Sequence, residues 1–175
     1  KFGALPAALK SGKIDFIAAG YTVRPDREQE MTFSKNYFRA VQAIIVEESN
    51  TEIQGAADLE NKKIGVQTGT TGDTLATEDI EGSDVQRYNN GLEAVLDLQN
   101  GNIDAVVIDI LPAEILASQH EGIEILEERA GEEEEYAIAV RKGDQELIDA
   151  INEVLDEMME SGEIDDLTNK YSIGE

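Results

Sequence analysis

The sequence predicts an α/β protein that contains two related lobes. Residues 11–20 align without gaps on residues 100–109, and each segment follows an amphipathic helical pattern that ends near a glycine. Short apolar runs with β-branched residues alternate with such helices, as in folds built on buried strands. If the repeat is real, Gly20 and Asp109 end equivalent strands, where open parallel sheets bind ligands. A Gly-x-Ile-Asp run is also ordinary turn chemistry between a helix and a strand, so this plainer interpretation stays open.

Composition excludes several classes of function. The 175 residues include 14 Lys and Arg against 38 Asp and Glu, a formal net charge of −24. Such a chain is poorly suited to bind nucleic acid, because affinity for phosphates depends on clustered basic residues. The longest apolar run, Tyr136–Val140, is far shorter than the roughly 20 residues that span a bilayer. Without cysteine there is no disulfide, thiolate nucleophile or cysteine-ligated metal.

Helices are predicted where apolar residues recur three and four positions apart. An opening helix with Leu5 and Leu9 on one face stops at Gly12. The longest helix begins after a capping Asp144 and ends at Gly162. The remaining helices are expected at Thr74–Asp79, Leu92–Gln99, Ile110–Gln119 and Glu163–Tyr171.

Strands are predicted where short apolar runs lie between turn residues. They are expected at Ile14–Ala19, Arg39–Val46, Lys63–Gln67, Gln86–Tyr88, Glu124–Leu126 and Tyr136–Val140. The polar segment Glu47–Gly55 is expected to follow a crossing between the lobes, and the chain is expected to return to the first lobe near Glu135. Lobe 1 is therefore predicted to comprise residues 1–43 and 136–175, and lobe 2 residues 44–135.

A Thr-Gly-rich turn is the first candidate binding element. The predicted strand Lys63–Gln67 is followed by Thr68-Gly69-Thr70-Thr71-Gly72 and then by a helix. Backbone N–H groups and hydroxyls at a helix N-terminus bind anions. The turn lacks the lysine of a phosphate-binding P-loop, so a carboxylate fits better than a triphosphate. Taken alone, a turn of this kind is more often an ordinary N-cap than a binding site.

Charged residues complete a pattern for an α-amino acid. Arg24 or Arg27 can bind a carboxylate through a bidentate guanidinium, although pairing with Glu28 or Glu30 is the plainer interpretation. Asp109 can accept an ammonium group, although it can equally cap the helix that follows it. Donors for a carboxylate and an acceptor for an amine together match an amino acid.

Motifs in a fixed order along essentially the whole chain carry a resemblance to a known family. They are Phe2-Gly3-Ala4-Leu5-Pro6-Ala7-Ala8-Leu9, Gly12-Lys13-Ile14-Asp15, Gly20-Tyr21-Thr22 with Arg27, Phe33-Ser34-x-x-Tyr37-Phe38, Gly65-Val66-x-x-Gly69-Thr70-Thr71-Gly72, Asp104-Ala105-Val106-Val107-x-Asp109 and Ala137-Ile138-Ala139-Val140-Arg141-Lys142-Gly143-Asp144. The chain resembles the family 3 extracellular solute-binding proteins of polar amino acid ABC transporters. The resemblance implies a periplasmic-binding-protein-like fold, with two α/β lobes and a ligand cleft at their hinge.

The resemblance also implies roles for individual residues. Arg27 would bind the ligand α-carboxylate together with Thr22 and the Thr70-Thr71 turn. Asp109 would bind the α-ammonium group, helped by the Gly20 carbonyl and the Thr22 hydroxyl. Phe2 would pack against the ligand. Side-chain selectivity is expected to involve Phe2, Tyr21, Gln67 and Thr68.

Two departures from the family pattern lead to further expectations. The second threonine of the usual Thr-x-Thr-x-x-Arg motif is replaced by Arg24, with Pro25 after it. Family members also carry a segment before the position of Phe2, so lobe 1 is expected to be incomplete. Because an uncovered sheet edge invites pairing between chains, we expect a truncated form, a proteolysed product or a strand-exchanged homodimer.

The implied function is capture of a free polar amino acid and its presentation to an ABC transporter permease. It needs no cofactor, and an extracellular or periplasmic location follows, with a lipid anchor as one option. One alternative is an enzyme on the same scaffold, such as a dehydratase or a murein lyase, although His120 looks like a surface residue. Another is metal binding by Glu132–Glu135 with Glu127 and Glu128.

Overall fold

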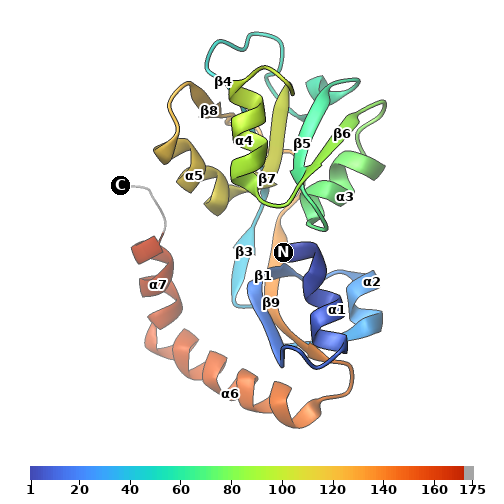
Figure 1. Ribbon diagram of the computed structural model, residues 1–175. Coiled ribbons are helices and arrows are strands. Elements are labelled where there is room, and N and C mark those ends of the chain that lie inside the picture. The colour runs from blue at the N-terminus through green and yellow to red at the C-terminus, as the bar shows by residue number, and fades with distance from the viewer. Residues whose placement is uncertain (172–175) are drawn as a thin grey trace. The chain divides into compact units, whose positions relative to one another are not determined.

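A computed structural model describes residues 1–171 and divides the chain into two compact units (Figure 1). Lys1–Gly3 and Val41–Glu133 form one, called here the five-stranded unit. Ala4–Ala40 and the described residues from Glu134 onward form the other, the four-stranded unit. Each unit contains its own sheet, which confirms the predicted α/β class.

The sheet of the five-stranded unit has the strand order β6-β5-β7-β4-β8. Its strands are β4 (Gln42–Glu47), β5 (Lys63–Gln67), β6 (Asp84–Tyr88), β7 (Ala105–Asp109) and β8 (Ile123–Ile125). Strand β5 runs parallel to β6 and β7, whereas β4 is antiparallel to β7 and β8. The carboxyl ends of β5 and β7 therefore meet at one edge of the sheet.

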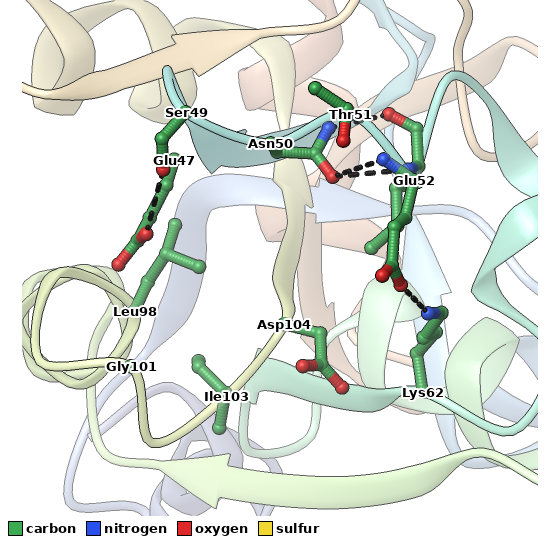
Figure 2. Close-up of a pocket in the computed structure, with 11 residues that line it drawn as sticks. Glu47, Ser49, Asn50, Thr51, Glu52, Lys62, Leu98, Gly101, Ile103 and Asp104 are labelled. Carbon is green, nitrogen blue, oxygen red and sulfur yellow. Dashed lines mark hydrogen bonds and ion pairs between the residues drawn. The ribbon is translucent and has the colours of Figure 1, made fainter.

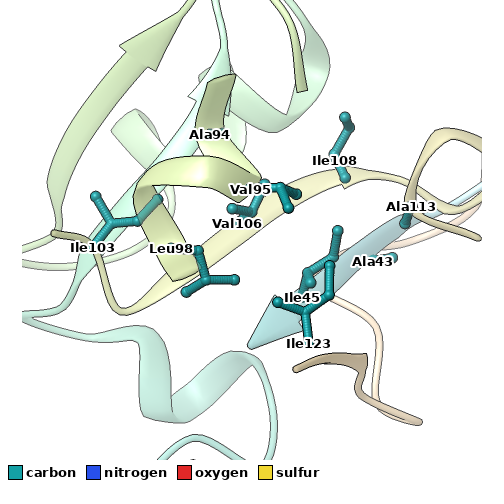
Figure 3. Close-up of a cluster of buried hydrophobic side chains, with 10 residues drawn as sticks. All are labelled: Ala43, Ile45, Ala94, Val95, Leu98, Ile103, Val106, Ile108, Ala113 and Ile123. Carbon is teal, nitrogen blue, oxygen red and sulfur yellow. The ribbon is translucent and has the colours of Figure 1, made fainter. Parts of the chain in front are cut away.

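Helices cover both faces of this sheet because successive strand side chains point to opposite sides. In β4, Ala43 and Ile45 enter one core and Ile44 and Val46 the other. The first core, drawn in Figure 3, includes residues of α4 (Gly91–Gln99) and α5 (Ile110–Gln119). The second includes residues of α3 (Thr71–Glu78) and of the short 3₁₀ helix η2 (Ala56–Leu59).

Strand β9 (Glu134–Arg141) organises the sheet of the four-stranded unit. Three strands pair antiparallel with it: β1 (Phe16–Thr22), β2 (Met31–Phe33) and β3 (Phe38–Ala40). The register of β1 against β9 shifts between Ile17 and Tyr21, and Gly20 within the shift has a φ of +57°. This irregularity shapes the end of β1 that carries predicted ligand contacts.

The remaining helices are η1 (Phe2–Ala4), α1 (Leu5–Lys10), α2 (Pro25–Glu30), α6 (Gln145–Ser161) and α7 (Glu163–Tyr171). Helix α6 ends at Ser161, and Gly162, the predicted stop, caps it in the left-handed conformation that is typical of helix ends. Asp144 occupies the N-cap position of α6, but its side chain makes no capping hydrogen bond and lies 3.6 Å from Arg141 instead.

Several predicted elements differ from the structure in their bounds, and two of the differences affect the strands around the site. The expected strand Arg39–Val46 is two strands, β3 and β4, which pair with different sheets on either side of Val41. The strand expected to end before Gly20 continues to Thr22. No helix within residues 1–171 combines the length and apolar character needed to cross a membrane.

Candidate functional site

Four predicted site residues gather at the carboxyl edge of the five-stranded sheet. Gln67 ends β5, Thr70 caps α3, Thr71 begins α3, and Asp109 ends β7. They lie at one edge because β5 and β7 are parallel neighbours, with Ile64 paired to Ala105. This is the edge at which open parallel sheets bind ligands.

Thr70 has a structural role in this turn. Its Oγ1 donates to the Gln67 carbonyl at 2.8 Å and accepts from the Asp73 N–H at 3.2 Å. This is the N-cap arrangement, which satisfies one otherwise unpaired N–H at the start of α3. The N-cap interpretation of the turn is thus correct for Thr70, and Thr71 is the adjacent hydroxyl.

Asp73 stiffens the same turn from inside the first turn of α3. Its carboxylate accepts from the Gly69 N–H and from Arg87 Nε, both at 2.9 Å. A buried carboxylate at a helix N-terminus is stabilised by the helix dipole, and here Arg87 neutralises it as well. Sequence reasoning missed Asp73, although an acidic residue three positions after a capping threonine is the signal for it.

Gln42, the first residue of β4, joins two of the predicted ligand contacts. Its side chain is almost fully buried, and its Nε2 donates to Thr71 Oγ1 at 3.0 Å and to the Asp109 carboxylate. A Cβ on Gly72 would lie 2.7 Å from Gln42 Oε1 and 3.1 Å from the Val107 carbonyl, so α3 approaches the sheet closely only with glycine there. Sequence reasoning missed Gln42.

The contact with Gln42 also bears on the role of Asp109. Asp109 is in the N-cap position of α5, but its side chain makes no capping hydrogen bond there. The plainer interpretation of Asp109 as a helix cap is therefore wrong. Its carboxylate instead accepts a hydrogen bond from Gln42, a residue far from it in the sequence.

Residues 1–3 pack onto the turn between β5 and α3. A Cβ on Gly3 would lie 3.1 Å from the Thr68 carbonyl, and a Cβ on Gly69 would lie 2.9 Å from the Gly3 Cα. Phe2, half-buried, is thus adjacent in sequence to a residue that touches the turn. The side chain of Gln67 points toward β6, with its Nε2 donating to the Asn89 carbonyl at 3.4 Å.

Arg27 is a buried cation of the four-stranded unit. It lies in α2 and is 7% exposed, its guanidinium carbon is 4.1 Å from the centre of the Tyr21 ring, and its NH1 donates to the Thr22 carbonyl at 2.9 Å. Burial lowers the pKa of Arg27, whereas the nearby Tyr21, Asp26 and Glu134 act in the opposite direction. Tyr21 in turn stacks on Phe33, and burial raises the pKa of Tyr21.

Arg24 has a different partner from the ones considered in the sequence. Its Nε and NH2 donate to the two carboxylate oxygens of Asp26 at 2.9 and 2.6 Å. This hydrogen bond raises the pKa of Arg24 and lowers that of Asp26. Because the guanidinium of Arg24 forms this bidentate pair with Asp26 in α2, Arg27 is the better candidate for binding a ligand carboxylate.

Gly20 and Thr22 sit on either side of Tyr21 at the end of β1. A Cβ on Gly20 would lie 3.0 Å from Tyr136 Cε2, so the close approach of this aromatic ring requires glycine. The Thr22 hydroxyl donates to Glu134 Oε2 at 2.7 Å. The structure therefore brings Gly20, Tyr21, Thr22 and Arg27 together within one unit.

A separate cavity of about 310 Å³ lies at the opposite edge of the five-stranded sheet (Figure 2). Its walls come from the segment after β4 and from residues that precede β5 and β7, including an ion pair between Glu52 and Lys62 at 2.6 Å. None of the predicted ligand residues lines it. Within residues 1–171, no three His, Asp or Glu side chains are grouped so that they could hold a metal ion.

Comparison with known proteins decides the family. The family model described as bacterial extracellular solute-binding proteins, family 3, matches residues 1–175. The chain belongs to this family. A probable histidine-binding protein from Neisseria gonorrhoeae is 33% identical to this chain. The alignment covers 94% of this chain and 63% of that protein. The chain thus spans less than two thirds of that relative.

Solved structures agree with the fold of this family 3 chain. An ancestral arginine-binding protein, solved with arginine and with glutamine, is 38% identical with a TM-score of 0.88, covering 99% of this chain and 77% of that one. An ancestral amino acid-binding protein, named as a precursor of cyclohexadienyl dehydratase, is 31% identical with a TM-score of 0.89, covering 98% and 74%. These relatives are named as binding proteins, and one of them is named as the precursor of an enzyme.

Proposed function

We infer that the protein binds a free polar amino acid and serves as the solute-binding component of an ABC importer. The observation that supports this most is the Gln42 contact, which holds a hydroxyl and a carboxylate side by side at the ligand-binding edge of the sheet. Relatives in the same family are named as binding histidine, cystine, arginine or glutamate. The common part of these ligands is the α-amino acid group.

The ligand α-carboxylate is assigned to Arg27, with Thr22 and the Thr70-Thr71 turn as further donors. The guanidinium of Arg27 is already desolvated and fixed by the Tyr21 ring and the Thr22 carbonyl. A preorganised cation loses little conformational entropy when it binds an anion. Within the turn, the Thr70 hydroxyl donates to the Gln67 carbonyl at 2.8 Å, and Thr71 supplies the second hydroxyl that we assign to the ligand.

The ligand α-ammonium group is assigned to Asp109, with the Gly20 carbonyl as an additional acceptor. The Asp109 carboxylate accepts from Gln42, and because a carboxylate can accept several hydrogen bonds, a ligand ammonium group can donate to it as well. Bringing a cation to Asp109 and an anion to Arg27 pairs each protein charge with a ligand charge. A zwitterion thus satisfies both sites at once. Phe2, Tyr21 and Gln67 are proposed to contact its side chain.

We also propose that the protein transfers its ligand unchanged to a membrane permease, outside the cytoplasm. The family name describes extracellular proteins, and the named relatives are binding proteins. His120 follows the last residue of α5, whereas Asp109 precedes its first residue, so His120 and Asp109 lie at opposite ends of this helix. An enzyme on the same fold is the second candidate function, because one related ancestral protein is named as the precursor of a dehydratase.

Calorimetric titration with a panel of polar L-amino acids tests the proposal. We expect saturable binding of at least one of them with a stoichiometry of one ligand per chain. Mass spectrometry of the recovered ligand separates binding from turnover, because a carrier returns the amino acid chemically unchanged. Absence of binding to every member of the panel would contradict the proposal, and a converted product would favour the enzyme.

A further inference from the structure

The hydroxyl of Thr22, a predicted donor to the ligand, already donates to an acidic side chain of the protein. Thr22 ends β1, Glu134 begins β9, and the Thr22 hydroxyl donates to Glu134 Oε2 at 2.7 Å. Thr22 is buried and Glu134 is half-buried. A hydroxyl has a single proton to donate, so in this arrangement the proton is directed to Glu134.

The same carboxylate compensates a buried cation. Arg27 is almost fully buried and donates to the Thr22 carbonyl, so Thr22 is in contact with both charged residues. Burial works against the charged form of Arg27, and the negative charges of Asp26 and, to a smaller extent, Glu134 help to maintain it. A buried guanidinium without compensation is costly. Glu134 therefore performs, in the protein without ligand, two tasks that a bound carboxylate can also perform.

We propose that Glu134 is an internal stand-in for the ligand carboxylate. In the protein without ligand, the Glu134 carboxylate accepts the Thr22 proton and helps to compensate Arg27, and the ligand carboxylate replaces it on binding. This inference rests on the proposed function, because it concerns the same Thr22 and Arg27. Two carboxylates cannot accept the one Thr22 proton, and their like charges repel at short range. The measured affinity is consequently reduced by the free energy of displacing Glu134.

The neighbouring residue provides a matched control. Glu135 carries the same charge one position later in β9, but it accepts from Asn36 and lies 3.8 Å from Arg39, which is exposed. It therefore reports the effect of removing one negative charge from this strand without changing the contact to Thr22. Since exposed ion pairs contribute little, Glu135→Gln is expected to have a small effect.

The experiment compares calorimetric affinities of wild-type protein, Glu134→Gln and Glu135→Gln for L-arginine, L-histidine and L-glutamine. We expect Glu134→Gln to bind about threefold to tenfold more tightly than wild type, with Glu135→Gln changed by less than about twofold. In the empty protein, Glu134→Gln is expected to lower the thermal unfolding temperature, and saturating ligand is expected to remove that difference. Glu134→Asp, whose shorter side chain retracts the carboxylate from Thr22, should shift affinity in the same direction if the Gln variant fails to fold.

The possible results separate the two proposals. If wild type binds none of the three amino acids, the proposed function is wrong for these ligands, and the stand-in role of Glu134 is overturned as well. If wild type binds and Glu134→Gln binds equally or more weakly, the stand-in role is wrong while the proposed function is unaffected. Equal tightening by both variants would also overturn it, since that result reports net charge alone.

Discussion

Gln42 donates its side-chain amide to the Asp109 carboxylate across neighbouring antiparallel strands of the five-stranded sheet. The two residues are register partners at the end of the β4–β7 pair, so backbone pairing and side-chain contact reinforce each other. The same Nε2 reaches Thr71 on α3. One buried amide therefore sets the positions of two proposed ligand contacts, Asp109 for the ammonium group and Thr71 for the carboxylate.

Replacing Gln42 should weaken ligand binding with little change in side-chain volume. Gln42→Met removes the donor to Asp109 and Thr71, and a hydrogen bond to a charged group contributes about 1.5–3 kcal/mol. We expect affinity to fall roughly tenfold to hundredfold in calorimetry. Gln86→Met is the control, because the Gln86 side chain donates to the exposed Asp84 at 2.7 Å and not to a predicted site residue among the described ones. Equal affinities for the two variants would show that Gln42 does not position the site.

The two arginines of the α2 segment should differ in their importance for binding. Arg27→Lys keeps the charge but loses the planar group above Tyr21, and we expect a loss of about 2 kcal/mol in binding, or roughly thirtyfold in affinity. Arg24→Lys is expected to change affinity by less than about threefold, because Arg24 pairs with Asp26. The reverse order in a titration would assign the ligand carboxylate to Arg24.

Gly20 should tolerate substitution less well than a glycine of similar conformation. Gly20→Ala places a methyl group in the left-handed region and 3.0 Å from Tyr136, so we expect a loss of about 2–3 kcal/mol in unfolding free energy. Gly12→Ala, with a φ of +71° and nothing within 4 Å, should lose only the conformational part, about 1 kcal/mol. Urea denaturation measures both. Matching losses would mean that Tyr136 moves aside at no cost.

Tyr88 should make stability depend on alkaline pH. Burial and then the hydrogen bond to Asp97 raise the pKa of Tyr88 from 10.0 to about 12. The phenol ionises more easily in the unfolded chain, so its contribution to stability is complete below about pH 10 and is lost as the pH rises toward 12.

Urea midpoints near pH 8 and pH 11 test this expectation. Wild type should lose more stability over the interval than Tyr88→Phe, which has no ionisable group at this position. Tyr171→Phe serves as the control because Tyr171 is 64% exposed, and it should behave as wild type does. A Tyr88→Phe variant that loses as much stability as wild type would contradict the assigned pKa.

Elements with strong local signals could be predicted closely from the sequence. The strand Lys63–Gln67 and the helices Ile110–Gln119 and Glu163–Tyr171 have the same bounds in the structure. The break at Val41 could not be predicted, because β3 and β4 differ in their strand partners rather than in local composition. Helix α2 was also missed, although proline in its first turn is compatible with helix initiation.

The candidate site could be predicted in part. Thr71 and Asp109 were recognised from the ends of predicted strands, and the structure brings them to one edge through the parallel β5–β7 pair. Gln42, 67 residues from Asp109 in the sequence, has no local signal beyond being polar at the start of an apolar strand. The ligand roles of the site residues, the lobe boundaries and a strand-exchanged homodimer stay predictions.

The central claim is that Asp109 binds the ammonium group of an amino acid ligand. The most direct test is a calorimetric double-mutant cycle in which wild type and Asp109→Asn each bind the best amino acid of the panel and its analogue lacking the amino group. We expect Asp109→Asn to weaken binding of the amino acid by more than about tenfold and to leave binding of the analogue within about twofold. Equal weakening of both ligands would contradict the claim, because the effect of Asp109 would then be independent of the ammonium group.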